Sequence, residues 1–171
     1  MELRNISLIG FMGTGKTSVG KILAKRLKRE VVDVDLYIEK NEKRKISEIF
    51  SDAGEAYFRS VEKKSIQEIS QRHGIVITTG GGAVLDLENL ETLKASGWVV
   101  CLSATPETIY KRVKDSRRRP LLDGKDKRAE IERLLALRKP FYEKADFTFE
   151  TDNRSSAQMA ELILQKLSDK L

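Results

Sequence analysis

The chain has 171 residues, 40% of them hydrophobic, which is enough for one sizeable core and near the usual size of a single domain. We expect one domain that spans residues 1–171. The first apolar run, Ile6 to Ile9, is too short for a signal-peptide core or a membrane span, so we expect a cytoplasmic protein that does not bind a membrane.

The formal charge of +6 and a pI near 9.4 predict an attraction to anions. Between Lys111 and Arg119, six basic residues accompany the single acid Asp115. No aromatic residue is interleaved with this cluster, so the stacking surfaces of single-strand binders are missing from it. The pattern favours a local site for a phosphorylated small molecule over nucleic acid.

Apolar runs alternate with helical patterns along the chain, which is typical of a parallel sheet with helices on both faces, an α/β fold. The predicted strands cover residues 6–9, 31–34, 75–79, 98–102 and 147–149. Helical patterns cover an amphipathic segment from about residue 16 to 27, and residues 46–50, 55–71, 87–95, 106–113, 127–144 and 155–167. Gly74 and Gly97 each follow a helical pattern and are expected to adopt the left-handed cap conformation.

The first loop, Gly10–Thr17, reads Gly-Phe-Met-Gly-Thr-Gly-Lys-Thr and matches G-x-x-x-x-G-K-[ST] between a strand and an amphipathic helix. Its glycines let backbone N–H groups and the helix N-terminus bind nucleotide phosphates. We expect Lys16 to bridge the outer phosphates and Thr17 to ligate Mg²⁺. A glycine-rich turn without a ligand does not need lysine and threonine there. The predicted nucleotide-binding residues of this loop are Gly13, Thr14, Gly15, Lys16, Thr17 and Ser18.

Two aspartates, Asp33 and Asp35, stand at the end of the second predicted strand, at the edge of the sheet where ligands bind. Residues two apart on a strand project to the same side, so both carboxylates are expected to face the phosphate loop. One aspartate can align an acceptor hydroxyl and remove its proton, while the other helps to hold magnesium. The alternative is a pair of solvated acids that cap the next helix.

Arginines and glycines farther along the chain suit a carboxylate-bearing acceptor. Arg59 and Glu62 lie three apart on a predicted helix, so the glutamate can hold the guanidinium in place for a planar carboxylate. Gly80–Gly82 is a glycine triplet whose bare backbone lets a ligand approach. Arg138 lies on a late helix, before a proline that should bend or end it.

These motifs occur in the order seen in shikimate kinases: the phosphate loop, Asp-x-Asp, Gly-Glu-x-x-Phe-Arg-x-x-Glu, the glycine triplet, Arg-Pro-Leu-Leu and Arg-x-Pro-x-Tyr. The chain resembles that family over about residues 10–154. The resemblance implies a nucleoside-monophosphate-kinase-like three-layer sandwich with five parallel strands, a mobile lid over about residues 112–126, and transfer of phosphate from ATP to the 3-hydroxyl of shikimate.

The resemblance also assigns residues. It implies that shikimate is held by Asp35, Arg59, Gly81, Gly82 and Arg138, with Glu62 orienting Arg59. It implies that Asp33 orders Mg²⁺ beside Thr17, that Arg119 of the lid swings onto the ATP phosphates, and that Arg112 and Arg154 contact the adenine side. The catalytic residues expected from it are Lys16, Asp35 and Arg119. This small family implies a monomer.

The sequence departs from the family near the base. The stretch between Arg112 and Arg119 is short and basic, and Ser155-Ser156-Ala157 lacks a proline often found beside the adenine. Other readings stay open at this point. One is a gluconate or nucleoside monophosphate kinase, and another is a regulatory or nucleic-acid-binding phosphate-loop module. No Asn-Lys-x-Asp guanine-reading motif occurs, which counts against a GTPase.

Overall fold

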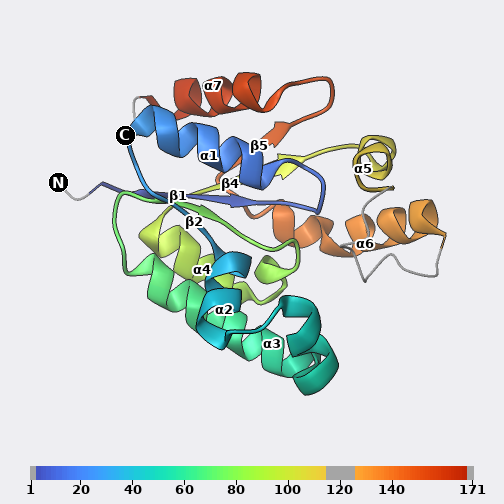
Figure 1. Ribbon diagram of the computed structural model, residues 1–171. Coiled ribbons are helices and arrows are strands. Elements are labelled where there is room, and N and C mark those ends of the chain that lie inside the picture. Colours follow the sequence, from blue (N-terminus) through green and yellow to red (C-terminus); the bar gives the residue numbers. More distant parts are fainter. Residues whose placement is uncertain (1–2, 115–125, 169–171) are drawn as a thin grey trace.

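Five parallel strands form one sheet in the order β2-β3-β1-β4-β5 (Figure 1). The computed structural model describes residues 3–114 and 126–168. The strands are β1 (Asn5–Ile9), β2 (Val31–Asp33), β3 (Val76–Thr78), β4 (Gly97–Ser103) and β5 (Phe147–Glu150). All five predicted strands are confirmed within one or two residues at each end.

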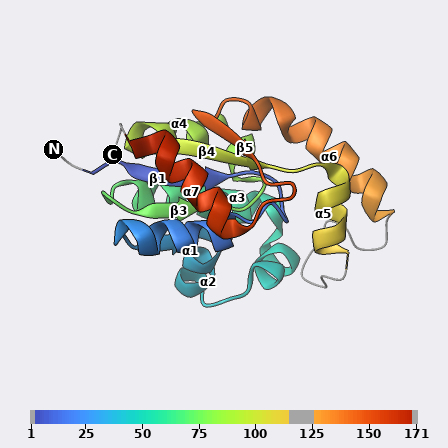
Figure 2. The ribbon, with the colours of Figure 1, turned by 90° about the horizontal axis from the view of Figure 1, so that it is seen from above.

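The helices are α1 (Lys16–Leu27), α2 (Val34–Glu42), α3 (Ile46–Ser70), α4 (Leu87–Ser96), α5 (Pro106–Val113), α6 (Lys127–Tyr142) and α7 (Ser156–Leu167), with a short 3-10 turn, η1 (Ala83–Leu85). Figures 1 and 2 show α1 and α7 on one face of the sheet and α2, α3 and α4 on the other. The predicted three-layer α/β/α sandwich is confirmed. Within the described parts of the chain, no helix is both long and apolar enough to cross a bilayer.

Alternating residues of the central strands feed the two core layers. On β4, Val100 and Leu102 pack with the α1 and α7 side chains, whereas Val99 and Cys101 pack with those of α2, α3 and α4. Every one of these strand residues is at most 2% exposed, as a sheet covered on both faces requires. The central strand β1 is likewise buried along its whole length.

Helix α2 was not predicted from the sequence. Residues 31–34 read as an apolar strand, but the strand ends at Asp33 and Val34 is already helical. Asp33 is the N-cap of α2, and its Oδ1 accepts a hydrogen bond from the Leu36 N–H at 3.2 Å. The placement of Asp35 on a strand is therefore wrong: it lies in the first turn of α2.

Gly74 and Gly97, both expected to be left-handed helix caps, differ in backbone conformation. Gly74 has a φ of +68° and is left-handed, as predicted. Gly97 is not left-handed: it is extended, begins β4, and lies so close to β1 that an added β-carbon would be 2.0 Å from the Asn5 carbonyl oxygen.

The predicted helices over 46–50 and 55–71 form one long element, α3, interrupted at Gly54 with a φ of +82°.

The carboxyl ends of β1, β2 and β3 meet at one edge of the sheet, because all the strands are parallel. The phosphate loop follows β1, Asp33 ends β2, and the glycine triplet follows β3. Helices α5 and α6 lie beyond this same edge in Figures 1 and 2. The topology thus brings together the segments in which the sequence motifs occur.

Candidate active site

The phosphate loop has the backbone geometry that its glycines predict. Gly13 and Gly15 have φ values of +76° and +93°, a region that other residues rarely adopt. Gly15 is the N-cap of α1 and has no side chain with which to cap the first-turn N–H groups. The buried Lys16 ammonium donates to the carbonyl oxygens of Gly10 and Phe11, at 2.8 Å each. This combination of a helix N-terminus without a side-chain cap and a lysine over the loop suits a polyphosphate.

Thr17, in the first turn of α1, lies beside Asp33, the last residue of β2. The Thr17 hydroxyl donates to Asp33 Oδ2 at 3.3 Å, and the Thr78 hydroxyl donates to the same oxygen at 2.9 Å. A hydroxyl and a carboxylate are hard oxygen ligands that suit Mg²⁺ when nucleotide phosphates supply further ligands. No group of three or more His, Cys, Asp or Glu residues gathers as a metal site among residues 3–114 and 126–168. The Thr17 hydroxyl and the Asp33 carboxylate are two oxygen ligands of the kind that Mg²⁺ takes.

Thr78 is a site residue that the sequence analysis missed. It ends β3 and lies opposite Asp33 in the β2–β3 register. Pairing of the two predicted strands by their ends would have suggested the contact. Its hydroxyl fixes one Asp33 oxygen while the helix cap fixes the other.

The Asp35 side chain is half-buried and lies against the glycine triplet. A β-carbon added at Gly80 would be only 3.0 Å from Asp35 Oδ1. Burial and, to a smaller extent, the Asp33 charge raise the pKa of Asp35 to about 6, while Lys16 and Arg59 oppose the shift. Those two cations come from the phosphate loop and from α3, so Asp35 lies within the fields of both. An acid with a pKa near neutrality in such a place is suited to proton transfer.

Arg59 is held by the glutamate that the sequence suggested. Its Nη1 donates to Glu62 Oε2 at 2.6 Å, and its Nη2 also contacts Glu55 Oε1 at 3.3 Å. Glu62 is only 1% exposed, and this burial raises its pKa even though the Arg59 charge opposes the shift. The second oxygen, Oε1, is buried and has no hydrogen-bond partner within the described part of the chain. Glu62 therefore holds the Arg59 guanidinium through one carboxylate oxygen, and its other oxygen can accept a further hydrogen bond.

The glycine triplet is where the separate motifs meet. A β-carbon at Gly82 would lie 2.7 Å from Arg59 Nη2, and one at Gly81 would lie 3.2 Å from Arg138 Nη1. The same added atom at Gly81 would be 3.4 Å from the backbone nitrogen of Met12, in the phosphate loop. Both arginines and the phosphate loop therefore surround this turn, and the missing side chains make room for them.

Arg138 comes from α6 and is only 5% exposed. Its guanidinium carbon lies 5.3 Å from the centre of the Phe11 ring, which places it against the phosphate loop. We expected Pro140 to bend or end α6. The helix does not end there but continues to Tyr142. The proline lies in the last turn, where the helix is about to end in any case.

A second part of the site lies beside the phosphate loop, over α1, α5 and the loop before α7. A cavity of about 310 Å³ is lined by Gly13, Thr14, Gly15, Val19, Arg112, Thr151, Arg154, Ser155, Ser156 and Met159. Arg112 donates to the carbonyl oxygens of Gly13 at 3.1 Å and Thr151 at 2.9 Å. The Arg154 guanidinium donates to the Glu150 carbonyl at 2.7 Å. Both arginines that were predicted on the nucleotide side therefore line this cavity.

The predicted lid over residues 112–126 overlaps the described structure only at its ends. Arg112 and Val113 form the end of α5, and Lys114 is its C-cap. Residues 115–125, and with them Arg119, lie outside the described residues.

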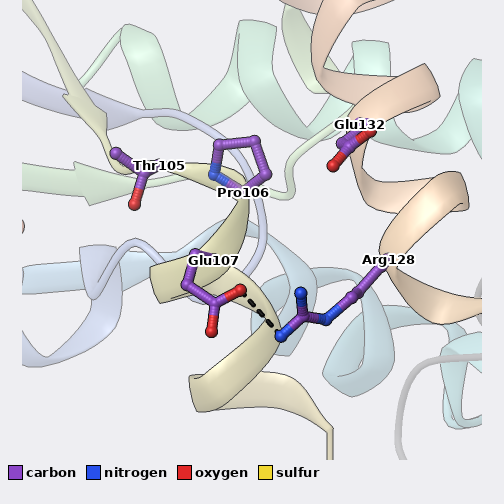
Figure 3. A pocket seen from close by; sticks show the side chains of 5 residues that line it. All are labelled: Thr105, Pro106, Glu107, Arg128 and Glu132. Carbon is purple, nitrogen blue, oxygen red and sulfur yellow. Dashed lines mark ion pairs between the residues drawn. The ribbon is translucent and has the colours of Figure 1, made fainter.

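A different cavity, of about 250 Å³, lies between α5 and α6 (Figure 3). It is lined by Thr105, Pro106, Glu107, Arg128 and Glu132, and the Arg128 guanidinium pairs with Glu107 at 2.8 Å. None of the predicted site residues that the structure describes lines it. Its exposed ion pair joins the first turns of the two helices.

A parallel sheet in the order 2-3-1-4-5, with a Gly-x-x-x-x-Gly-Lys-Thr loop after its central strand, defines a P-loop kinase. A family model described as "Shikimate kinase" matches residues 12–168. The shikimate kinase of Thermodesulfovibrio yellowstonii is 47% identical over 164 residues, which cover 96% of this chain and 95% of that protein. The chain belongs to the shikimate kinase family.

Two further comparisons agree. The shikimate kinase of Caldicellulosiruptor saccharolyticus is 45% identical over 95% of this chain and 94% of its own length. The solved structure of shikimate kinase from Acinetobacter baumannii in complex with shikimate has a TM-score of 0.94 and 40% identity, and the match covers 99% of this chain and 96% of that one. The recognition made from the motifs is confirmed.

Proposed function

We propose that this chain transfers the terminal phosphate of ATP to the 3-hydroxyl of shikimate. The observation that carries the proposal is the convergence of Asp35, Arg59 and Arg138 on the glycine triplet, in contact with the phosphate loop. Family membership supports the same activity, because the relatives carry that name and one of them was solved with shikimate. A gluconate kinase is not favoured by these comparisons.

In the proposed reaction, the two guanidinium groups of Arg59 and Arg138 hold the acceptor carboxylate and leave the 3-hydroxyl facing Asp35. The hydroxyl oxygen forms a bond to the terminal phosphorus, and the bond to the bridging oxygen breaks, so that ADP leaves with the electron pair. The hydroxyl proton passes to the Asp35 carboxylate and then to water. Lys16 and the loop N–H groups stabilise the charge that develops on the phosphate oxygens.

Magnesium would be held by Thr17 and by Asp33, the latter directly or through water, and it would supply charge neutralisation to the phosphates. Arg119 would add a cation from the lid, and Arg112 and Arg154 would border the base. A cytoplasmic monomer with one domain and a lid, binding neither nucleic acid nor membrane, completes the proposal.

The decisive test is a coupled assay of ADP release with ATP, magnesium and shikimate, run beside gluconate and beside no acceptor. Release that requires shikimate supports the proposal. Release that is equal with gluconate, or equal without an acceptor, would overturn it. Mass spectrometry of the product, which should be heavier than shikimate by one phosphoryl group, identifies the acceptor without relying on ADP release.

Replacement of Arg59 by alanine should raise the KM for shikimate by about 10- to 100-fold, because a charge-assisted hydrogen bond contributes about 1.5–3 kcal/mol. The KM for ATP should stay close to the wild-type value, since Arg59 contacts the glutamates of α3 and the glycine triplet. Steady-state kinetics with each substrate varied in turn check this. Lys63→Ala, which removes another acid-paired cation of α3, is the matched control. An unchanged shikimate KM in Arg59→Ala would argue against the acceptor assignment.

The value of kcat/KM for shikimate should fall as the pH drops below about 6. The reason is the raised pKa of Asp35, which keeps the proton up to a higher pH than usual, so the reactive carboxylate is lost as the pH falls through that value. A profile from pH 5 to 8 with saturating ATP checks this. A terminal phosphate also titrates at about pH 6. The acidic limb must therefore vanish in Asp35→Asn, and a limb that persists belongs to the nucleotide.

A further inference from the structure

The last turn of α6 places a tyrosine hydroxyl between two parts of the acceptor site. Tyr142 is 8% exposed, and its hydroxyl donates to the Gly81 carbonyl oxygen at 2.6 Å. Arg138 lies one helical turn earlier on the same face of α6. Its guanidinium interacts with the phenol oxygen. Tyr142 is therefore bonded to the glycine, and lies beside the arginine, that the proposed function assigns to shikimate.

Tyr142, Arg138 and Gly81 lie close to one another. Arg138 Nη1 lies 3.2 Å from the position that a β-carbon added at Gly81 would take. A phenol oxygen has one proton to donate and lone pairs that accept, so it can satisfy the carbonyl and the guanidinium at the same time. Burial raises the pKa of Tyr142 to about 12, although the Arg138 charge opposes the shift. The hydroxyl keeps its proton at neutral pH and remains a donor.

The glycine triplet needs such an anchor. Glycines have the widest backbone freedom of all residues, so three in succession do not hold one conformation by themselves. The flanks are fixed, because the Ala83 N–H donates to the Gly80 carbonyl at 3.2 Å and the buried Asn89 amide donates to the Ala83 carbonyl at 2.9 Å. Tyr142 holds the carbonyl of the middle glycine.

We propose that Tyr142 is a positioning residue that fixes Arg138 and the Gly81 peptide relative to each other and so sets the affinity for the acceptor carboxylate. The inference rests on the proposed function. Tyr142 touches neither phosphate nor acceptor in this role: it acts through the two groups that do. Its loss should therefore affect the acceptor and leave the nucleotide side unaltered.

Tyr142→Phe removes one oxygen atom and keeps the buried ring. We expect the KM for shikimate to rise about tenfold, as loss of a hydrogen bond to a charged group predicts, with kcat and the KM for ATP within about twofold of wild type. KM does not depend on the active fraction, so partial unfolding does not imitate this result. Tyr37→Phe, which removes the hydroxyl of a partly buried tyrosine that donates to Glu68 at 3.0 Å, is the matched control and should leave both KM values unaltered. Tyr142→Met also lacks the hydroxyl and is the second variant should Tyr142→Phe not fold. We expect the same rise in the KM for shikimate relative to the KM for ATP.

A double-mutant cycle separates positioning from packing. In an Arg138→Lys background, Tyr142→Phe should raise the shikimate KM much less than tenfold, because the arginine it orients is already gone. An unaltered KM in Tyr142→Phe, an equal rise for both substrates, or a full tenfold rise in the Arg138→Lys background would each overturn the positioning role. Absence of shikimate turnover in the wild-type protein would contradict the proposed function itself and is distinguishable from these outcomes.

Discussion

Lys16→Met should reduce phosphoryl transfer by at least about 10³-fold, as expected when a preorganised cation is removed from the position where charge develops. The ammonium is buried over the loop and donates to two loop carbonyls, so its charge is aimed inward before any ligand arrives. Methionine has a similar length and no charge, and it preserves the packing of the stem. The measurement is ADP release with saturating ATP and shikimate.

The control for Lys16→Met is Lys21→Met, which removes an exposed lysine of the same helix and should leave turnover unaffected. Shikimate binding by the Lys16 variant, followed by calorimetry, should survive, because the acceptor contacts come from other elements. Turnover within about tenfold of wild type would remove Lys16 from the proposed mechanism. A parallel loss in Lys21→Met would show that the effect is on α1 and not on the site.

Asp35→Asn should reduce kcat by about 10²- to 10⁴-fold, the usual range for general acid–base catalysis, with ATP affinity retained. The amide keeps the shape of the carboxylate but cannot take a proton at neutral pH. The surroundings should tolerate the change, because burial already disfavours the charge on Asp35. Single-turnover kinetics give the rate of the chemical step directly.

Asp52→Asn, an exposed aspartate on α3, is the matched control and should show normal turnover. A near-normal kcat in Asp35→Asn would mean that the carboxylate is not needed to align or deprotonate the hydroxyl. An intermediate loss of about tenfold, combined with a preserved acidic limb in the pH profile, would likewise contradict the role of Asp35 as the base.

The order of strands and helices was largely predictable from the sequence, because buried parallel strands read as short apolar runs between helical periods. Helix α2 escaped because only Val34 and Ile38 of it are buried, one turn apart, too few to show a period. The β-branched run before it also blurred the end of the strand. The N-cap Asp33, and not a change in hydrophobicity, marks that boundary.

The motifs name the proposed site residues, but the arrangement of these residues in space was not predictable from the sequence. Asp35 was expected beside the phosphate loop by strand alternation, and it reaches that region from a helix instead. The approach of Arg59 and Arg138 to successive glycines depends on how α3 and α6 pack, which no local pattern contains. Gly97 illustrates the same limit, since its role is a close contact with a strand 92 positions earlier in the chain.

The position of β1 in the sheet has an evolutionary consequence. It is paired on both sides, by β3 and β4, whereas β2 is an edge strand followed by the sparsely buried α2. We therefore expect substitutions to be absorbed more easily around β2 and α2 than around β1 and the phosphate loop. A scaffold divided in this way can diversify its choice of acceptor while keeping one way of activating the phosphate donor.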